Sequence, residues 1–223
     1  MLIAEDLVLL LVDDATGKPV TDGTKLDHAV AGAVLLELAL QGRVDVAGAD
    51  EEVRKGRLVV RDQSPTGNAL LDDALALIAD KRGKKPDSVI GPLSKGLRNR
   101  LLGGLADRGI LRREDGRILG IFPTTKWPAA DSHHENSLRS RLHDILVVGM
   151  TPDDRAGALV SLLSAIDVVP KIVESSDKRA VKRRAKEIAQ GAWAADAVRR
   201  AIEAVNAATV AMIAATSAAS SGS

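Results

Sequence analysis

The sequence has no cysteine and no tyrosine, and only one phenylalanine among its 223 residues. The absence of cysteine excludes disulfide bonds and thiolate metal sites, and it fits a reducing compartment. Because aromatic rings are so few, the core has to be built from Leu, Val, Ile and Ala. The heavy use of Ala, Gly, Arg and Asp is typical of a GC-rich bacterial gene. With 45% hydrophobic and 27% charged residues, the chain has the composition of a globular protein.

The sequence also lacks an excess of charge and a long apolar run. Its formal net charge is +1, so no overall field draws the protein to nucleic acid or to an anionic membrane, and any basic site has to be local. The N-terminal segment carries Glu5 and Asp6 and no basic region before its apolar run, which disfavours a secretory signal. No other stretch approaches about 18 uninterrupted apolar residues, so we expect a soluble, cytoplasmic protein whose membrane contacts are peripheral.

The hydrophobic pattern predicts a mainly α-helical single domain over residues 1–215, followed by an Ala- and Ser-rich tail, 216–223, that frays. The segment Leu26–Leu40 is apolar on almost every side, which indicates the buried central helix of the fold. Glu37 interrupts it, and we expect this carboxylate to be satisfied by an arginine or by backbone donors rather than to be catalytic. Trp193 is expected in the core.

Two small β-hairpins are predicted beside the helices. Arg43–Ala47 and Arg57–Asp62 alternate with a period of two, as the strands of a ribbon do. Ile110–Phe122 is expected to form a second hairpin with its turn at Asp115-Gly116, a dipeptide that favours tight hairpin turns. Further helices are expected at residues 2–12, 71–80, 97–108, 136–148, 151–166 and 178–190 and at the C-terminus.

The strongest local charge lies in the predicted helix near residues 178–190. Its basic side chains lie opposite the apolar residues Val181, Ala185 and Ile188. The basic residues are Lys178, Arg179, Lys182, Arg183, Arg184 and Lys186. One interpretation is the solvated face of a packed helix. The other is a surface for anionic lipid headgroups, to which each cation near the membrane contributes about 1 kcal/mol. The residues expected to face the membrane are Lys178, Lys182, Arg183 and Lys186.

No motif for catalysis, metal or cofactor binding is apparent. His133, His134 and Glu135, with His143, lack the spacing of a metal site, so we expect a polar loop there. There is no Gly-rich phosphate loop, nucleophile elbow or paired-acid motif. We therefore expect no catalytic residue, no metal and no cofactor.

Four separated segments carry a resemblance to a known family. They are, in chain order, Leu35–Arg43, Pro65–Leu75, Leu97–Leu111 and Ile118–Thr125. Together they resemble the Golgi phosphoprotein 3 family, whose eukaryotic members are peripheral membrane proteins that bind phosphatidylinositol 4-phosphate. The resemblance covers about residues 2–205 and implies a non-enzymatic adaptor. The partners it implies are anionic phospholipid headgroups at the inner face of the membrane, membrane-protein tails and further copies of the chain.

The headgroup pocket of that family consists of a tryptophan and an arginine around the second helix and two basic residues one turn apart on a later helix. In this sequence the tryptophan position falls on Asp22 and the arginine position on Ala31. The two basic positions fall on Arg141 and Asp144. Each lost charge-assisted hydrogen bond costs roughly 1.5–3 kcal/mol. We therefore expect a largely substituted pocket and generic binding of anionic lipid or protein.

Where a headgroup site remains, we predict it at Arg141 and Arg139, covered by Trp127. A helix N-terminus near Asn136 would add unpaired backbone N–H groups, which suit an anion. Two alternatives are open: Trp127 pins its loop to the core, and Arg141 only pairs with Asp144 one turn further on.

A second function is also compatible with the pattern, that of a winged-helix-like nucleic-acid-binding protein. The helix at residues 97–108 is followed by a hairpin, and Lys95, Arg98 and Arg100 would lie at the helix that reads DNA. The near-neutral total charge and the resemblance of this segment to the family weigh against it. We therefore expect no nucleic-acid partner.

Overall fold

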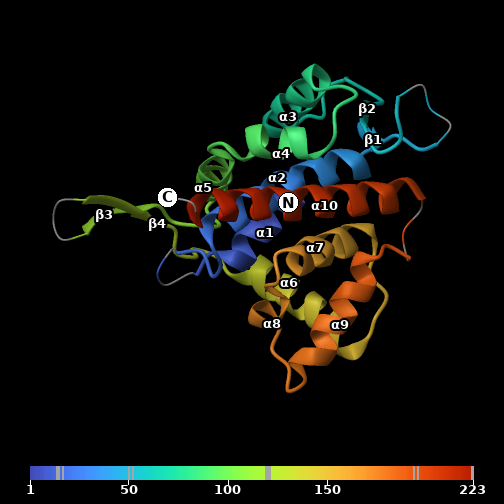
Figure 1. Cartoon of the computed structure of the whole chain (residues 1–223). Coiled ribbons are helices and arrows are strands. Elements are labelled where there is room, and N and C mark those ends of the chain that lie inside the picture. The colour runs from blue at the N-terminus through green and yellow to red at the C-terminus, as the bar shows by residue number, and fades with distance from the viewer. Residues whose placement is uncertain are drawn as a thin grey trace.

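The computed structural model describes residues 1–13, 16, 18–49, 51, 53–118, 122–192, 194 and 196–221. It shows a mainly helical fold with two small antiparallel sheets, as predicted (Figure 1). The α-helices are α1 (Ile3–Leu11), α2 (Gly23–Leu40), α3 (Ala69–Asp80), α4 (Asp87–Ser94), α5 (Leu97–Asp107), α6 (His133–His143), α7 (Asp154–Ala165), α8 (Val169–Ile172), α9 (Lys178–Ala189) and α10 (Asp196–Ser221). The strands and the π-helix are β1 (Val44–Val46), β2 (Leu58–Val60), β3 (Glu114–Ile118), β4 (Phe122–Lys126) and η1 (Asp144–Val148).

Helix α2 is the centre of the fold, which confirms the prediction made from its apolarity. At its start the carboxylate of Asp22 accepts hydrogen bonds from the N–H groups of Thr24 and Lys25, at 3.0 and 3.1 Å. Its middle is buried because α1, α4, α7 and α10 pack around it. Gly32 permits a close approach of α10, since a Cβ at this position would lie 2.9 Å from the hydroxyl oxygen of Thr209.

The two hairpins differ in how well the sequence predicted them. β1 pairs with β2 as expected. In the second hairpin, β3 and β4 pair in a register that places Asp115 opposite Thr125 and Gly116 opposite Thr124. The predicted span of 110–122 and its turn at the Asp-Gly dipeptide are therefore wrong. The physical reason is cross-strand bonding, because the Thr125 hydroxyl donates a hydrogen bond of 2.9 Å to the Asp115 carboxylate and holds this residue in a strand.

The helix predicted from residue 136 begins earlier and changes type. Helix α6 starts at His133 after the cap residue Ser132, so Asn136 lies in the first turn and not at the N-terminus. At Asp144 the backbone widens into the π-helix η1, which ends at Gly149 with a φ of 94°. Such a positive φ strongly favours glycine.

Helix α10 extends to Ser221, beyond the boundary expected at residue 215. Its segment Val198–Ala219 is long and apolar enough to cross a membrane by length and composition, with a mean hydropathy of 1.4. This is weak evidence of a span, because a core helix of a globular protein meets the same criterion. Here α10 packs on α2, α4 and α7. Trp193, expected in the core, lies outside the described residues.

Candidate functional site

A buried charge network ties α1 and α2 to the start of α7. Glu37 accepts a hydrogen bond of 2.7 Å from the backbone N–H of Ile3 and one of 2.9 Å from the guanidinium of Arg155. Arg155 also lies 3.6 Å from the carboxylate of Asp6. The expectation that an arginine and backbone donors satisfy Glu37 is confirmed, and the network serves the packing of three helices.

The histidine cluster belongs to this structural network. His133, His134 and Glu135 form the first turn of α6, so the predicted polar loop is wrong. The ring Nε2 of His134 lies 2.8 Å from the carboxylate of Asp6, which places this face of α6 against α1. Within the described part of the chain, no group of three His, Cys, Asp or Glu side chains is arranged to hold a metal ion.

The two arginines predicted to bind a headgroup are both held by protein acceptors. Arg139 donates to the Glu135 carboxylate at 2.7 Å and to the backbone carbonyl of Ile172 at 3.2 Å. Arg141 forms an ion pair with Asp153, the cap residue of α7. The alternative in which Arg141 pairs with Asp144 is therefore wrong. Both arginines connect α6 to elements that follow it.

The environment of Asp153 shows that this contact has an electrostatic effect. Burial acts to raise the pKa of the carboxyl group, but the hydrogen bond from the Ala156 N–H and the charge of Arg141 outweigh it and lower the pKa. The carboxylate is thus held in its charged form at the start of α7, where a negative charge also stabilises the helix dipole.

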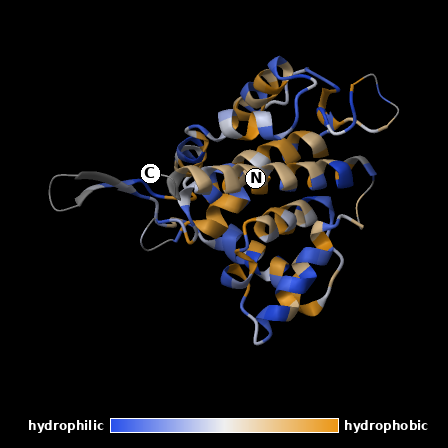
Figure 2. Ribbon diagram, in the orientation of Figure 1, coloured by the Kyte–Doolittle hydropathy of each residue, from blue (hydrophilic) through white to orange (hydrophobic). Residues whose placement is uncertain are grey.

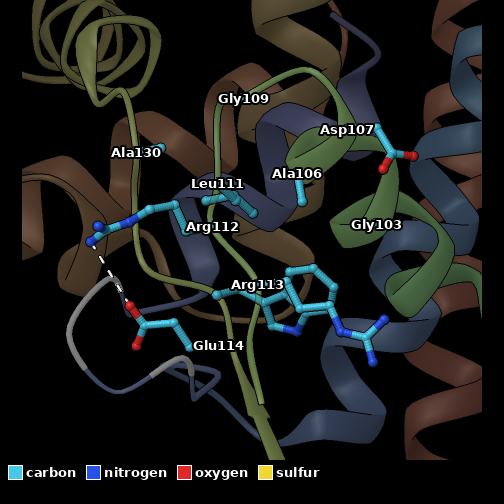
Figure 3. Close-up of a pocket in the computed structure, with 10 residues that line it drawn as sticks. Gly103, Ala106, Asp107, Gly109, Leu111, Arg112, Arg113, Glu114 and Ala130 are labelled. Carbon is cyan, nitrogen blue, oxygen red and sulfur yellow. Dashed lines mark ion pairs between the residues drawn. The ribbon is translucent and has the colours of Figure 1, made fainter.

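Trp127 lies in a different neighbourhood. Its side chain is 9% exposed, and the guanidinium carbon of Arg113 lies 5.9 Å from the centre of its ring. It helps to line an open cleft of about 560 Å³ between α5 and the base of the β3–β4 hairpin (Figure 3). Among the described residues, no hydrogen bond, ion pair or ring contact joins Trp127 to Arg139 or Arg141.

Helix α9 presents the basic face that the sequence predicted. Asp177 caps its start by accepting hydrogen bonds from the N–H groups of Arg179 and Ala180. Val181, Ala185 and Ile188 are buried against the protein. On the other side, exposed cations without an ion pair in the described part of the chain are Lys178, Arg179, Arg183 and Lys186. Of the predicted membrane-facing residues, Lys182 is the exception, because it pairs with Asp167 at 2.7 Å.

A further cation lies against the start of α2. The Nε of Arg98 is 3.3 Å from the carboxylate of Asp27, and its Nη1 would be 3.4 Å from a Cβ at Gly23. This Nη1 atom is buried and has no hydrogen-bond partner among the described residues. Burial raises the pKa of Asp27, and the charge of Arg98 opposes that effect.

Comparison with known proteins decides the family. The sequence profile described as Golgi phosphoprotein 3 (GPP34) matches residues 3–205. The chain belongs to the Golgi phosphoprotein 3 family. It is similar to vacuolar protein sorting-associated protein 74 of Eremothecium gossypii, with 30% identity over 65% of this chain and 49% of the relative. The protein of the same name from Schizosaccharomyces pombe is 25% identical over 73% of this chain and 53% of its own length. The chain thus spans about half the length of these relatives.

The residues that the sequence comparison above expects at pocket positions lie on different elements. Asp22 caps α2, and Ala31 is fully buried in its middle. Arg141 lies on α6 and is engaged with α7. Arg98, in contrast, contacts α2 at Asp27, five residues after Asp22, and Lys95 is the residue that follows α4. Sequence reasoning considered Lys95 and Arg98 only as DNA contacts, and the contact of Arg98 with α2 is a long-range relation that no local pattern signals.

Proposed function

We propose that this chain is a peripheral membrane adaptor that binds anionic phospholipid headgroups mainly through charge. The observation that carries the proposal is the outer face of α9, where exposed cations form no ion pair with any residue that the structure describes. A cation that is already paired gains little from a phosphate, whereas an unpaired one contributes about 1 kcal/mol near an anionic surface. Membership of the Golgi phosphoprotein 3 family supports the same function.

Selectivity for phosphatidylinositol 4-phosphate is expected to be weak. The family positions that would hold an aromatic ring and a cation carry Asp22 and Ala31. The Asp22 carboxylate occupies the backbone donors at the start of α2, and Asp27 adds a second acidic group nearby. A doubly charged phosphate at this end of α2 would meet two carboxylates, which disfavours tight binding.

A headgroup has two candidate positions. The first is the predicted site at Arg141, Arg139 and Trp127, where each arginine would have to exchange a carboxylate for the ligand. The second is at Arg98 beside α2, with Lys95 three residues before it in the sequence. We favour the second, because Arg98 contacts Asp27 through Nε, while its Nη1 has no partner among the described residues and can donate to a phosphate oxygen without displacing a carboxylate. The nearby carboxylates of Asp22 and Asp27 keep such binding weak.

The adaptor role extends the proposal to proteins. The two relatives are named as proteins associated with vacuolar protein sorting. We propose that the chain likewise connects a membrane to membrane-protein tails or to further copies of itself, at the inner face of the membrane and without catalysis. Its Ala-, Gly-, Arg- and Asp-rich composition supports a bacterial-type member of the family.

The nucleic-acid alternative is not supported by the contacts of its key residues. Arg98 is paired with Asp27, and Arg100 lies 2.6 Å from the carboxylate of Asp73. Both cations would approach phosphates together with an acidic partner, which weakens attraction to DNA.

Vesicle sedimentation tests the proposed function. Vesicles with an anionic lipid should bind the protein, and neutral vesicles should not. Binding should fall steeply as salt rises from about 50 to about 500 mM, because salt screens exposed charges. Tight binding that survives high salt and requires a 4-phosphate headgroup would contradict the proposal.

Two variants then locate the headgroup. Arg98→Ala should weaken anion binding more than Arg141→Ala does. If Arg141→Ala leaves binding unchanged while neutralisation of Lys182, Arg183 and Lys186 abolishes it, the pocket predicted on α6 is vestigial.

A further inference from the structure

The turn that follows η1 exposes a cluster of large apolar side chains. Val147 is 41% exposed, Val148 67% and Met150 57%. Elsewhere in the described residues, the large apolar side chains with comparable exposure are Met1 and Val210. Three such side chains lie within four positions of the chain, and we call Val147, Val148 and Met150 the η1 tip. Its exposure to water is unfavourable for an isolated protein.

The tip has a defined backbone because the residues before it are buried and a hydrogen bond closes its turn. Ile145 and Leu146 are each 3% exposed and anchor η1 in the core. The N–H of Met150 donates a hydrogen bond of 3.0 Å to the carbonyl of Asp144, which closes the turn at Gly149. The exposed side chains are therefore held outside the core by buried neighbours.

The tip is next to the basic helix. Element η1 packs against α9, and in Figure 1 the yellow chain between α6 and α7 passes beside this orange helix. Figure 2 shows that α9 consists mainly of hydrophilic residues and that hydrophobic segments lie beside it. Helix α9 carries six basic side chains and one acidic side chain over Lys178–Ala189. Apolar side chains beside a basic helix are the combination by which peripheral proteins engage an anionic membrane.

We propose that the η1 tip inserts into the headgroup region of an anionic bilayer while α9 lies against its surface. This proposal rests on the proposed membrane function and adds an apolar element to it. The charge of α9 identifies the partner, because anionic lipid supplies both the negative surface and the apolar interior that the two elements require. An apolar protein surface would satisfy the tip and leave the exposed cations of α9 without counterions.

The absence of cysteine makes insertion directly measurable. A single cysteine introduced by Val148→Cys can be labelled with an environment-sensitive NBD fluorophore, and Val210→Cys on α10 provides an exposed apolar control. With vesicles containing phosphatidylglycerol, fluorescence at position 148 should rise severalfold and shift to shorter wavelength. A quencher attached to the lipid chains should reduce it. The label at position 210 should respond to neither.

A second pair of variants separates insertion from attraction. The double variant Val148→Asn, Met150→Gln, which removes apolar surface without adding charge, should lower affinity for these vesicles about tenfold and leave the salt dependence of the remaining binding unchanged. Val210→Asn should bind as the wild type does. Because all of these positions are exposed, thermal unfolding should be similar in every variant.

The outcomes for the two proposals are distinguishable. Tip insertion would be overturned if the labelled protein binds vesicles without a fluorescence change at position 148, or if the double variant binds them with full affinity. Either outcome would leave charge-driven binding intact. If the wild-type protein binds no anionic vesicle, both proposals are wrong.

Discussion

Two groups of charged residues in this protein have opposite surroundings. Around α1, the carboxylates of Glu5, Asp6 and Glu37 are each less than a tenth exposed, and each meets a cation or a backbone donor. On α9, cations of similar number are exposed and have few acidic neighbours. The first group fastens helices together, whereas the second leaves its charge available to a partner. Pairing, rather than charge density, therefore distinguishes the structural charges from those that we propose to bind a partner.

The largest effect is expected when the buried group is broken. Replacing Glu37 by alanine removes the acceptor of the buried Ile3 N–H and one partner of Arg155, which keeps its contact with Asp6. We expect the free energy of unfolding to fall by about 2 kcal/mol, because the Ile3 N–H is left unsatisfied, whereas Arg155 is partly exposed to solvent. Urea denaturation measures this change. A loss below about 1 kcal/mol would mean that the network around Glu37 contributes little to holding α1, α2 and α7 together.

An intermediate effect is expected at Asp153, which is exposed but caps α7 and pairs with Arg141. Asp153→Ala should cost about 1 kcal/mol through loss of the cap. Since the folded protein lowers the pKa of this carboxyl group, its contribution is present above the ordinary pKa of about 4 and is lost as pH falls through the lowered value.

Unfolding experiments at several pH values check this prediction. The stability difference between wild type and Asp153→Ala should be constant near neutrality and should shrink in acid. The neighbouring exposed residue Asp154 supplies the control, since Asp154→Ala removes a charge from the same turn without removing the cap. Equal losses in the two variants would show that the cap is unimportant.

The smallest effect on stability is expected on α9. Replacing Lys178, Arg179, Arg183 and Lys186 together by glutamine should change the free energy of unfolding by less than about 1 kcal/mol, because exposed unpaired charges contribute little to folding. The same variant should lose at least about tenfold in affinity for anionic vesicles. If this variant is strongly destabilised, or if it binds vesicles normally, the α9 cations do not differ from the buried charges around α1 in the way proposed.

The sequence was sufficient for features that depend on local periodicity and much less so for features that depend on distant contacts. The buried helix α2 and the basic face of α9 follow from the spacing of their apolar residues. The Asp115-Gly116 turn was mispredicted because a favourable dipeptide is overridden by cross-strand pairing. Arg98 reaches α2 across about seventy positions of sequence, and Arg141 pairs with Asp153 at the start of the next α-helix, so neither contact leaves a local signature.

The link between Arg155 and Glu37 also bears on the order of folding. The two residues are 118 positions apart, so their ion pair closes a very long loop. Such a contact forms only after α1, α2 and α7 have come together, because the entropy of closing the loop must first be offset by packing. We therefore expect the pair to be absent from the transition state, so that its loss accelerates unfolding while the folding rate stays nearly constant. On this expectation the ion pair of Arg155 slows unfolding and so lengthens the lifetime of the native state.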